Sequence, residues 1–221
     1  MKAEEGHDAL FLSGETRVKI CGVTNEEDAA MAVDLGADAI GINLFAGSKR
    51  FVELASVREW VADIRATRVA VVVNATSADL TAIEEAGCFD AVQFHGDESP
   101  GTCAAHGGRW IRAVRVRDWA TLDAAANAYL TPWLLLDAFS KSGYGGTGEG
   151  VDLRLAEEFV RKERDRRVIL AGGLTPETVA EAVRVVRPHA VDVASGVEVV
   201  GDPRRKDREQ VRAFVEAAKS G

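Results

Sequence analysis

The sequence predicts an α/β protein that folds as a single-domain (β/α)₈ barrel of the TIM type. From Arg17 onward, short apolar runs alternate with helical stretches, and eight such pairs fit into about 200 residues, within the range of this fold. No change of composition and no linker interrupts the alternation, which predicts one domain over residues 17–221. Polar residues and glycines follow several apolar runs, where such a barrel carries its active site.

An open, doubly wound sheet is the alternative fold. That fold would show the pattern G-x-G-x-x-G after the first strand. The residues that follow the first apolar run are instead Cys21-Gly22-Val23-Thr24. The barrel is therefore the preferred prediction.

The first βα unit shows the signals that define the later ones. Val18 and Ile20 are β-branched and apolar, and Gly22 ends the run. Asn25 then caps a helix whose first turn is acidic, and Gly36 ends that helix.

The same signals predict the remaining elements. Further strands are predicted at Ala39–Leu44, Arg68–Val73, Ala91–His95, Trp110–Val116, Trp133–Asp137, Val168–Ala171 and Ala190–Ala194. Helices are predicted at Glu26–Leu35, Ser56–Arg65, Ser77–Gly87, Pro100–His106, Trp119–Ala128, Leu153–Arg164 and Asp207–Lys219. Ser77 is the predicted N-cap of the third helix, and a further helix starts from the cap Thr175. A glycine-rich loop at Ser142–Gly150 and a short extra helix within Val197–Gly201 complete the expected elements.

The composition restricts the class of partner. Hydrophobic residues make up 47% of the 221 residues and charged residues 28%, as in ordinary soluble globular proteins. The net charge of −8 argues against binding to nucleic acid or to an anionic membrane. A local phosphate site is still compatible with this charge, because backbone amides bind phosphate.

The cysteines and the N-terminus indicate a cytoplasmic protein. Cys21, Cys88 and Cys103 are odd in number and lack metal-ligand spacing, so neither a disulfide framework nor a zinc site is expected. Residues 1–16 are predicted to be a flexible extension, and they lack the basic and apolar regions of a secretory signal. No apolar run approaches the length that spans a membrane.

Two candidate catalytic groups stand at strand ends. Cys21 follows the first strand, although a lone cysteine is more often a small buried apolar residue. Asp137 ends a run of three leucines, and the partial desolvation of its carboxyl group favours the protonated form near neutral pH. Strands 1 and 6 are three apart in an eight-stranded barrel, so Cys21 and Asp137 are expected to face each other across the mouth, with an acid on one side of a substrate and a base on the other. The alternative for Asp137 is a helix cap or a salt-bridge partner.

Other polar residues are candidates for binding the substrate. Arg50 lies in the loop after strand 2, and Gln93 and His95 share one face of strand 4. A histidine at a strand end is, however, more often a hydrogen-bonded structural group than a catalyst. Lys19 and Asp192 lie on neighbouring strands 1 and 8, and we expect a buried ion pair that favours the Cys21 thiolate. The alternative is that strand parity points one of the two outward.

The loops after strands 7 and 8 predict a phosphate site. They contain Gly172 and Gly173 after strand 7, and Ser195 and Gly196 after strand 8. These two loops form the usual phosphate site of a (β/α)₈ barrel, and glycine lets the backbone approach a ligand closely. The alternative is that both are simple glycine turns.

Several blocks in order resemble the phosphoribosylanthranilate isomerase family of the tryptophan pathway. The resemblance covers Arg17 to about Lys219. It rests on Lys19–Thr24, Gly36–Gly41, Ser48–Arg50, Val73–Asn74, Val92–Gly96, Leu136–Asp137, Gly145–Gly148, Gly172–Glu177 and Val191–Glu198.

The resemblance implies an Amadori rearrangement of N-(5-phosphoribosyl)anthranilate. Asp137 would be the general acid that opens the ribose ring to an iminium, and Cys21 the general base that removes the C2′ proton. Arg50 would hold the anthranilate carboxylate. The anthranilate nitrogen supplies the electron sink, so the resemblance implies no cofactor and no metal. It also implies a small phosphorylated substrate and a monomer or homodimer.

Two stretches depart from the family pattern. Asn43–Gly47 replaces an aromatic, proline-containing stretch, and Glu149–Leu153 replaces a lysine followed by Phe-Asp-Trp. A dual-substrate histidine/tryptophan isomerase is one alternative, but such enzymes carry an aspartate where this chain has Cys21. A phosphate-binding barrel without catalysis is another, but the presence of both Cys21 and Asp137 argues against it.

Overall fold

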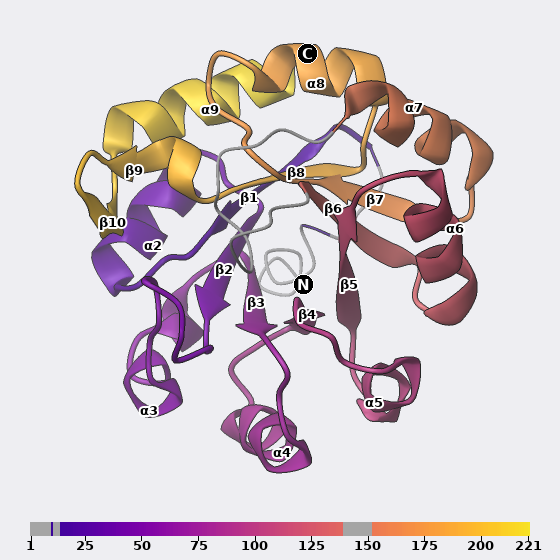
Figure 1. Cartoon of the computed structure of the whole chain (residues 1–221). Coiled ribbons are helices and arrows are strands. Elements are labelled where there is room, and N and C mark those ends of the chain that lie inside the picture. The colour runs from indigo at the N-terminus through magenta and orange to yellow at the C-terminus, as the bar shows by residue number, and fades with distance from the viewer. Residues whose placement is uncertain (1–9, 11–13, 139–151) are drawn as a thin grey trace.

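The computed structural model describes residue 10, residues 14–138 and residues 152–221. Eight parallel strands form a closed barrel in chain order, and β1 pairs with both β2 and β8. Helices surround the ring of strands (Figure 1). The predicted (β/α)₈ barrel is confirmed, and the doubly wound alternative is wrong. No helix in the described part of the chain is both long and apolar enough to cross a membrane.

The strands and helices alternate along the chain. The barrel strands are β1 (Arg17–Cys21), β2 (Ala39–Asn43), β3 (Thr67–Val72), β4 (Ala91–Phe94), β5 (Trp110–Val116), β6 (Trp133–Ala138), β7 (Arg167–Leu170) and β8 (Ala190–Val193). The helices are α2 (Glu26–Asp34), α3 (Leu54–Val57), α4 (Ser77–Ala86), α5 (Pro100–Ala105), α6 (Trp119–Ala128), α7 (Leu153–Lys162), α8 (Val179–Val186) and α9 (Arg208–Ser220). Short 3₁₀ turns are η2 (Val61–Asp63) and η3 (Ser195–Val197).

The predicted helix at Ser56–Arg65 is wrong. The segment forms the four-residue α3 and then the separate turn η2. Val57, Val61 and Ile64 are buried at helical spacing, which explains the prediction. No side chain caps the start of α3, and the chain leaves helical geometry at Trp60, whose φ is −131°.

Two predicted N-caps are displaced. Thr76, not Ser77, caps α4 and forms a reciprocal capping box with Asp79. Thr175 does not cap α8, because that helix begins only at Val179. The Thr175 amide instead donates to the Thr178 hydroxyl across a preceding turn, at 3.0 Å.

A small hairpin follows β8 in place of the predicted helix within Val197–Gly201. The turn η3 is followed by β9 (Glu198–Val199), which pairs antiparallel with β10 (Asp202–Lys206). The hairpin lies beside α2 (Figure 1), and the Lys206 amide donates to the Asp28 carboxylate at 2.8 Å. Gly201 turns the hairpin with a φ of +83°, a conformation that favours glycine.

The core has one layer inside the barrel and others between strands and helices. Leu10 belongs to the inner layer, is fully buried, and donates its amide to the Thr67 hydroxyl at 3.0 Å. Most of the predicted flexible extension, residues 1–9 and 11–13, lies outside the described residues, so that expectation stays a prediction. The predicted glycine-rich loop at Ser142–Gly150 also lies outside them.

Candidate active site

A cavity of about 520 Å³ opens at the carboxyl ends of the strands. Eight of the predicted site residues line it: Cys21, Arg50, His95, Asp137, Gly172, Gly173, Asp192 and Ser195. Lys19 and Gln93 are fully buried and do not line it, and Gly196 does not line it either. Cys21 reaches the cavity from β1 and Asp137 reaches it from β6, as the barrel order predicts.

Lys19 and Asp192 form the ion pair that the sequence predicts. They are register partners on β1 and β8, and the Lys19 Nζ lies 2.5 Å from the Asp192 Oδ1. Gly41 on β2 leaves the room for this arrangement, since a Cβ there would lie 2.8 Å from both the Lys19 Nζ and the Cys21 Sγ. The buried ammonium therefore lies close to the candidate base.

Lys19 lowers the pKa of the Cys21 thiol, as expected, but it does not determine the direction of the overall shift. Burial and then the charge of Asp192 raise the pKa of the Cys21 thiol, while Lys19 and Lys206 lower it. The balance is a pKa above the ordinary value. Because the ammonium is paired with a carboxylate, the cation alone does not set the ionisation of the thiol.

Asp137 is buried and held by two contacts. Its Oδ1 accepts the Ala138 amide at 2.9 Å, and its Oδ2 lies 3.1 Å from the His95 Nε2. The Gln93 amide nitrogen lies 2.9 Å from the His95 Nδ1. With Gln93 donating to Nδ1, the ring proton lies on Nε2 and is donated to Asp137. Gln93 thus acts on the cavity through His95.

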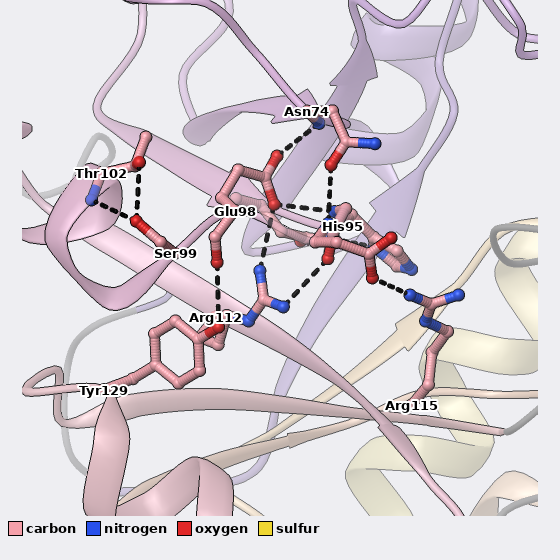
Figure 2. A network of polar contacts seen from close by, with 11 residues as sticks. Asn74, His95, Glu98, Ser99, Thr102, Arg112, Arg115 and Tyr129 are labelled. Carbon is pink, nitrogen blue, oxygen red and sulfur yellow. Dashed lines mark hydrogen bonds and ion pairs between the residues drawn. The ribbon is translucent and has the colours of Figure 1, made fainter.

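A network of buried polar contacts fixes the loop that follows His95 (Figure 2). The Glu98 carboxylate accepts the amides of Asn74 and Gly96, at 2.7 and 2.9 Å, and the Arg112 Nη1 at 3.0 Å. The Arg112 Nη2 also donates to the Gly96 carbonyl at 2.9 Å. The network therefore joins the loops after β3 and β4 next to the residue that contacts Asp137.

The two predicted phosphate loops come together at one side of the cavity. Gly172 and Gly173 have φ values of +82° and +69°. A Cβ at Gly172 would lie 2.5 Å from the Ala138 amide nitrogen, so the loop packs directly against the end of β6. A Cβ at Gly196 would lie 2.2 Å from the Leu174 carbonyl oxygen, so the loops after β7 and β8 are in contact.

Residues 18–217 match the family model described as N-(5'phosphoribosyl)anthranilate (PRA) isomerase. The chain belongs to this family.

Individual members of the PRA isomerase family are similar in sequence to nearly the whole chain. The N-(5'-phosphoribosyl)anthranilate isomerase of Geobacter sp. (strain M21) is 44% identical over 208 residues, which cover 92% of this chain and 98% of the relative. The solved enzyme from Thermotoga maritima is 37% identical with a TM-score of 0.85, covering 93% of this chain and all of that one. Another solved phosphoribosyl anthranilate isomerase, in complex with reduced 1-(o-carboxyphenylamino)-1-deoxyribulose 5-phosphate, is 33% identical with a TM-score of 0.79, covering 93% and 100%.

Sequence reasoning missed several polar residues around this PRA isomerase cavity. Glu98, Arg112 and Lys206 are buried charges that it did not single out. Glu198 is part of a block that carries the family resemblance, but no role was derived for it. A charged residue inside the apolar pattern of β5 was the available signal for Arg112. Within the described residues, no group of three or more potential metal ligands was found.

Proposed function

We propose that the protein converts N-(5'-phosphoribosyl)anthranilate to 1-(2-carboxyphenylamino)-1-deoxyribulose 5-phosphate in tryptophan biosynthesis. The observation that carries this proposal is a single cavity lined by Cys21, Asp137, Arg50 and both glycine loops. The chain's membership of the PRA isomerase family supports the same reaction. The reaction is an isomerisation, so atoms are only rearranged within the substrate.

Asp137 is the general acid of the first step. It donates a proton to the ribose ring oxygen, the bond from that oxygen to C1′ breaks, and the nitrogen lone pair forms the iminium. Its orientation is supported by the contacts with Ala138 and His95. A carboxyl group held in this way loses little freedom when it transfers its proton.

Cys21 is the general base of the second step. The thiolate removes the C2′ proton, and the electron pair forms the C1′–C2′ double bond and neutralises the iminium nitrogen. The enolamine then gains a proton at C1′ and loses the proton of its C2′ hydroxyl, which gives the ketone. Because the pKa of Cys21 is raised, the thiol must lose its proton before this step, and the cationic iminium adjacent to C2′ favours that loss.

The remaining groups bind the substrate. Arg50 takes the anthranilate carboxylate, and the loops with Gly172, Gly173, Ser195 and Gly196 take the phosphate. His95 and Asp192 line the cavity, whereas Lys19 and Gln93 act from beneath it. A cytoplasmic location and a monomeric or homodimeric state belong to this proposal, and the Thermotoga maritima relative is described as dimeric.

The test is turnover of N-(5'-phosphoribosyl)anthranilate by the purified protein, followed by the loss of anthranilate fluorescence. We expect multiple turnovers without added metal or cofactor and competitive inhibition by inorganic phosphate. The corresponding substrate of the histidine pathway should give no turnover. A purified, folded protein that turns over neither substrate would leave the phosphate-binding barrel without catalysis as the better account.

A further inference from the structure

Arg50 is held in one orientation by a carboxylate that no step of the proposed reaction uses. We propose that Glu198, itself held by Lys206, is a positioning residue that presents the Arg50 guanidinium to the carboxylate of the substrate. This inference rests on the proposed function, because it assumes that Arg50 binds that carboxylate. Glu198 comes from the hairpin after β8, far from Arg50 in sequence.

The geometry of the Arg50–Glu198 pair leaves one edge of the guanidinium for a ligand. The Arg50 Nε lies 2.5 Å from the Glu198 Oε1, and the Nη2 lies 3.0 Å from the Oε2. This is the side-on bidentate arrangement, which uses the edge formed by Nε and Nη2. The end-on edge, formed by Nη1 and the second hydrogen of Nη2, has no hydrogen-bond partner among the described residues. A guanidinium has room for a second carboxylate on that edge.

The aliphatic stem of the Arg50 side chain is held in place as well as its guanidinium group. A Cβ at Gly22 would lie 2.2 Å from the Arg50 Cδ, so the stem crosses directly over the backbone that follows Cys21. Gly22 has a φ of +71°, which also favours glycine. Arg50 is therefore held next to the candidate base at one end and by Glu198 at the other.

Lys206 holds Glu198 in turn. Its fully buried ammonium lies 3.1 Å from the Glu198 Oε1 and donates to the Ala194 carbonyl at 3.1 Å. Its backbone amide is anchored to Asp28 of α2. The carboxylate is thus fixed by the hairpin, and the hairpin is fixed to the barrel.

The charges of Arg50, Glu198 and Lys206 favour the binding of an anionic ligand. Burial acts against the charge of Glu198, but Arg50 and Lys206 hold the pKa of its carboxyl group below the ordinary value. Glu198 is therefore ionised at neutral pH. Burial lowers the pKa of the Lys206 ammonium, so Arg50 is the cation at the cavity edge that a substrate carboxylate would meet.

Two other roles for Glu198 make different predictions. If it competed with the substrate for Arg50, its removal would tighten binding. If it only stabilised the fold, its removal would weaken binding of any ligand, with or without a carboxylate. A positioning role instead predicts weaker binding that is confined to ligands with the carboxylate.

The experiment compares Glu198→Gln with the unchanged protein in calorimetric titrations, which need no turnover. The probes are reduced 1-(o-carboxyphenylamino)-1-deoxyribulose 5-phosphate and the same compound without its carboxyl group. We expect Glu198→Gln to raise Kd for the first by about tenfold, a loss typical for one charge-assisted contact. Kd for the second should stay within about twofold, as for the exposed control Glu181→Gln on α8.

A double variant protects the test against a folding defect. Glu198→Gln with Lys206→Met removes one anion and one buried cation together, so no buried ammonium loses its partner. We expect the same selective loss for the double variant. Equal losses for both probes, or tighter binding of the carboxylate probe, would overturn the positioning role. Failure of the proposed function is seen separately, as absence of turnover by the unchanged protein.

Discussion

The imidazole of His95 links a buried amide to the carboxyl group of Asp137. Its Nε2 lies 3.1 Å from the Asp137 Oδ2, and its Nδ1 lies 2.9 Å from the Gln93 Nε2. His95 follows β4, and its side chain reaches past β5 to Asp137 at the end of β6. Because both ring nitrogens are engaged, the ring has one orientation and fixes one oxygen of the proposed acid.

The His95 contact predicts a loss in kcat without loss of the fold. His95→Asn is too short to reach Asp137, so the acid should lose its orientation, and kcat should fall about tenfold with a smaller change in KM. Steady-state kinetics checks this result. His106→Asn, at the end of α5 and outside the cavity lining, is the control and should keep kcat. An unchanged kcat in His95→Asn would mean that the imidazole does not orient the acid.

Lys19 and Asp192 should shift the pH–rate profile in opposite directions. Asp192 raises the pKa of Cys21 and Lys19 lowers it, and the proposed mechanism uses the thiolate as the base. The rate should therefore rise with pH towards the pKa of the thiol. Lys19→Met should move this rise to higher pH, and Asp192→Asn should move it to lower pH. Profiles of kcat/KM against pH check this, and shifts in the same direction would contradict it.

Arg50→Lys should weaken substrate binding. Lysine keeps the charge and a contact with Glu198, but it loses the planar edge that binds a carboxylate through two hydrogen bonds. We expect KM to rise about tenfold while Tm stays nearly unchanged, because the buried charge balance is kept. Kinetics and thermal unfolding of the same preparation check both parts. Unchanged KM and kcat would show that Arg50 does not contact the substrate.

The Glu98 network should contribute to stability. Glu98→Gln leaves the buried Arg112 guanidinium without its anionic partner, so the free energy of unfolding should fall by about 3 kcal/mol. The exposed pair of Glu181 and Arg184 is the control, and Glu181→Gln should change stability by less than about 1 kcal/mol. Urea unfolding of both variants measures the difference. Equal losses of unfolding free energy in the two variants would mean that the buried pair stabilises the fold no more than the exposed pair does.

The sequence predicted those features that depend on local patterns and on the barrel order. The bounds of β5 and α6 agree with the predicted ones, because apolar runs and turn residues define them locally. The Lys19–Asp192 pair followed from the adjacency of the first and last strands. The position of Cys21 and Asp137 in the cavity followed from the rule that active sites of this fold lie at the carboxyl ends of the strands.

Other features needed the three-dimensional arrangement. The Arg50–Glu198 pair joins residues 148 positions apart, and no local pattern encodes which loops meet. The hairpin of β9 and β10 shows no regular apolar alternation, and the buried Lys206 side chain contacts the Ala194 carbonyl and Glu198. The direction of the Cys21 pKa shift depends first on burial and then on the charge of Asp192, and the lowering effect of Lys19 does not offset them.

Cys21 and Asp137 are proposed to be the base and the acid of the isomerisation. The most direct test is kcat for N-(5'-phosphoribosyl)anthranilate with Cys21→Ala and Asp137→Asn, measured beside the unchanged protein. Each variant should lower kcat about 100-fold or more with a much smaller change in KM, because proton transfer acts in the transition state. Cys21→Ser should also be poor, since a hydroxyl is a weaker base than a thiolate. A near-normal kcat in Cys21→Ala or Asp137→Asn would contradict the assignment.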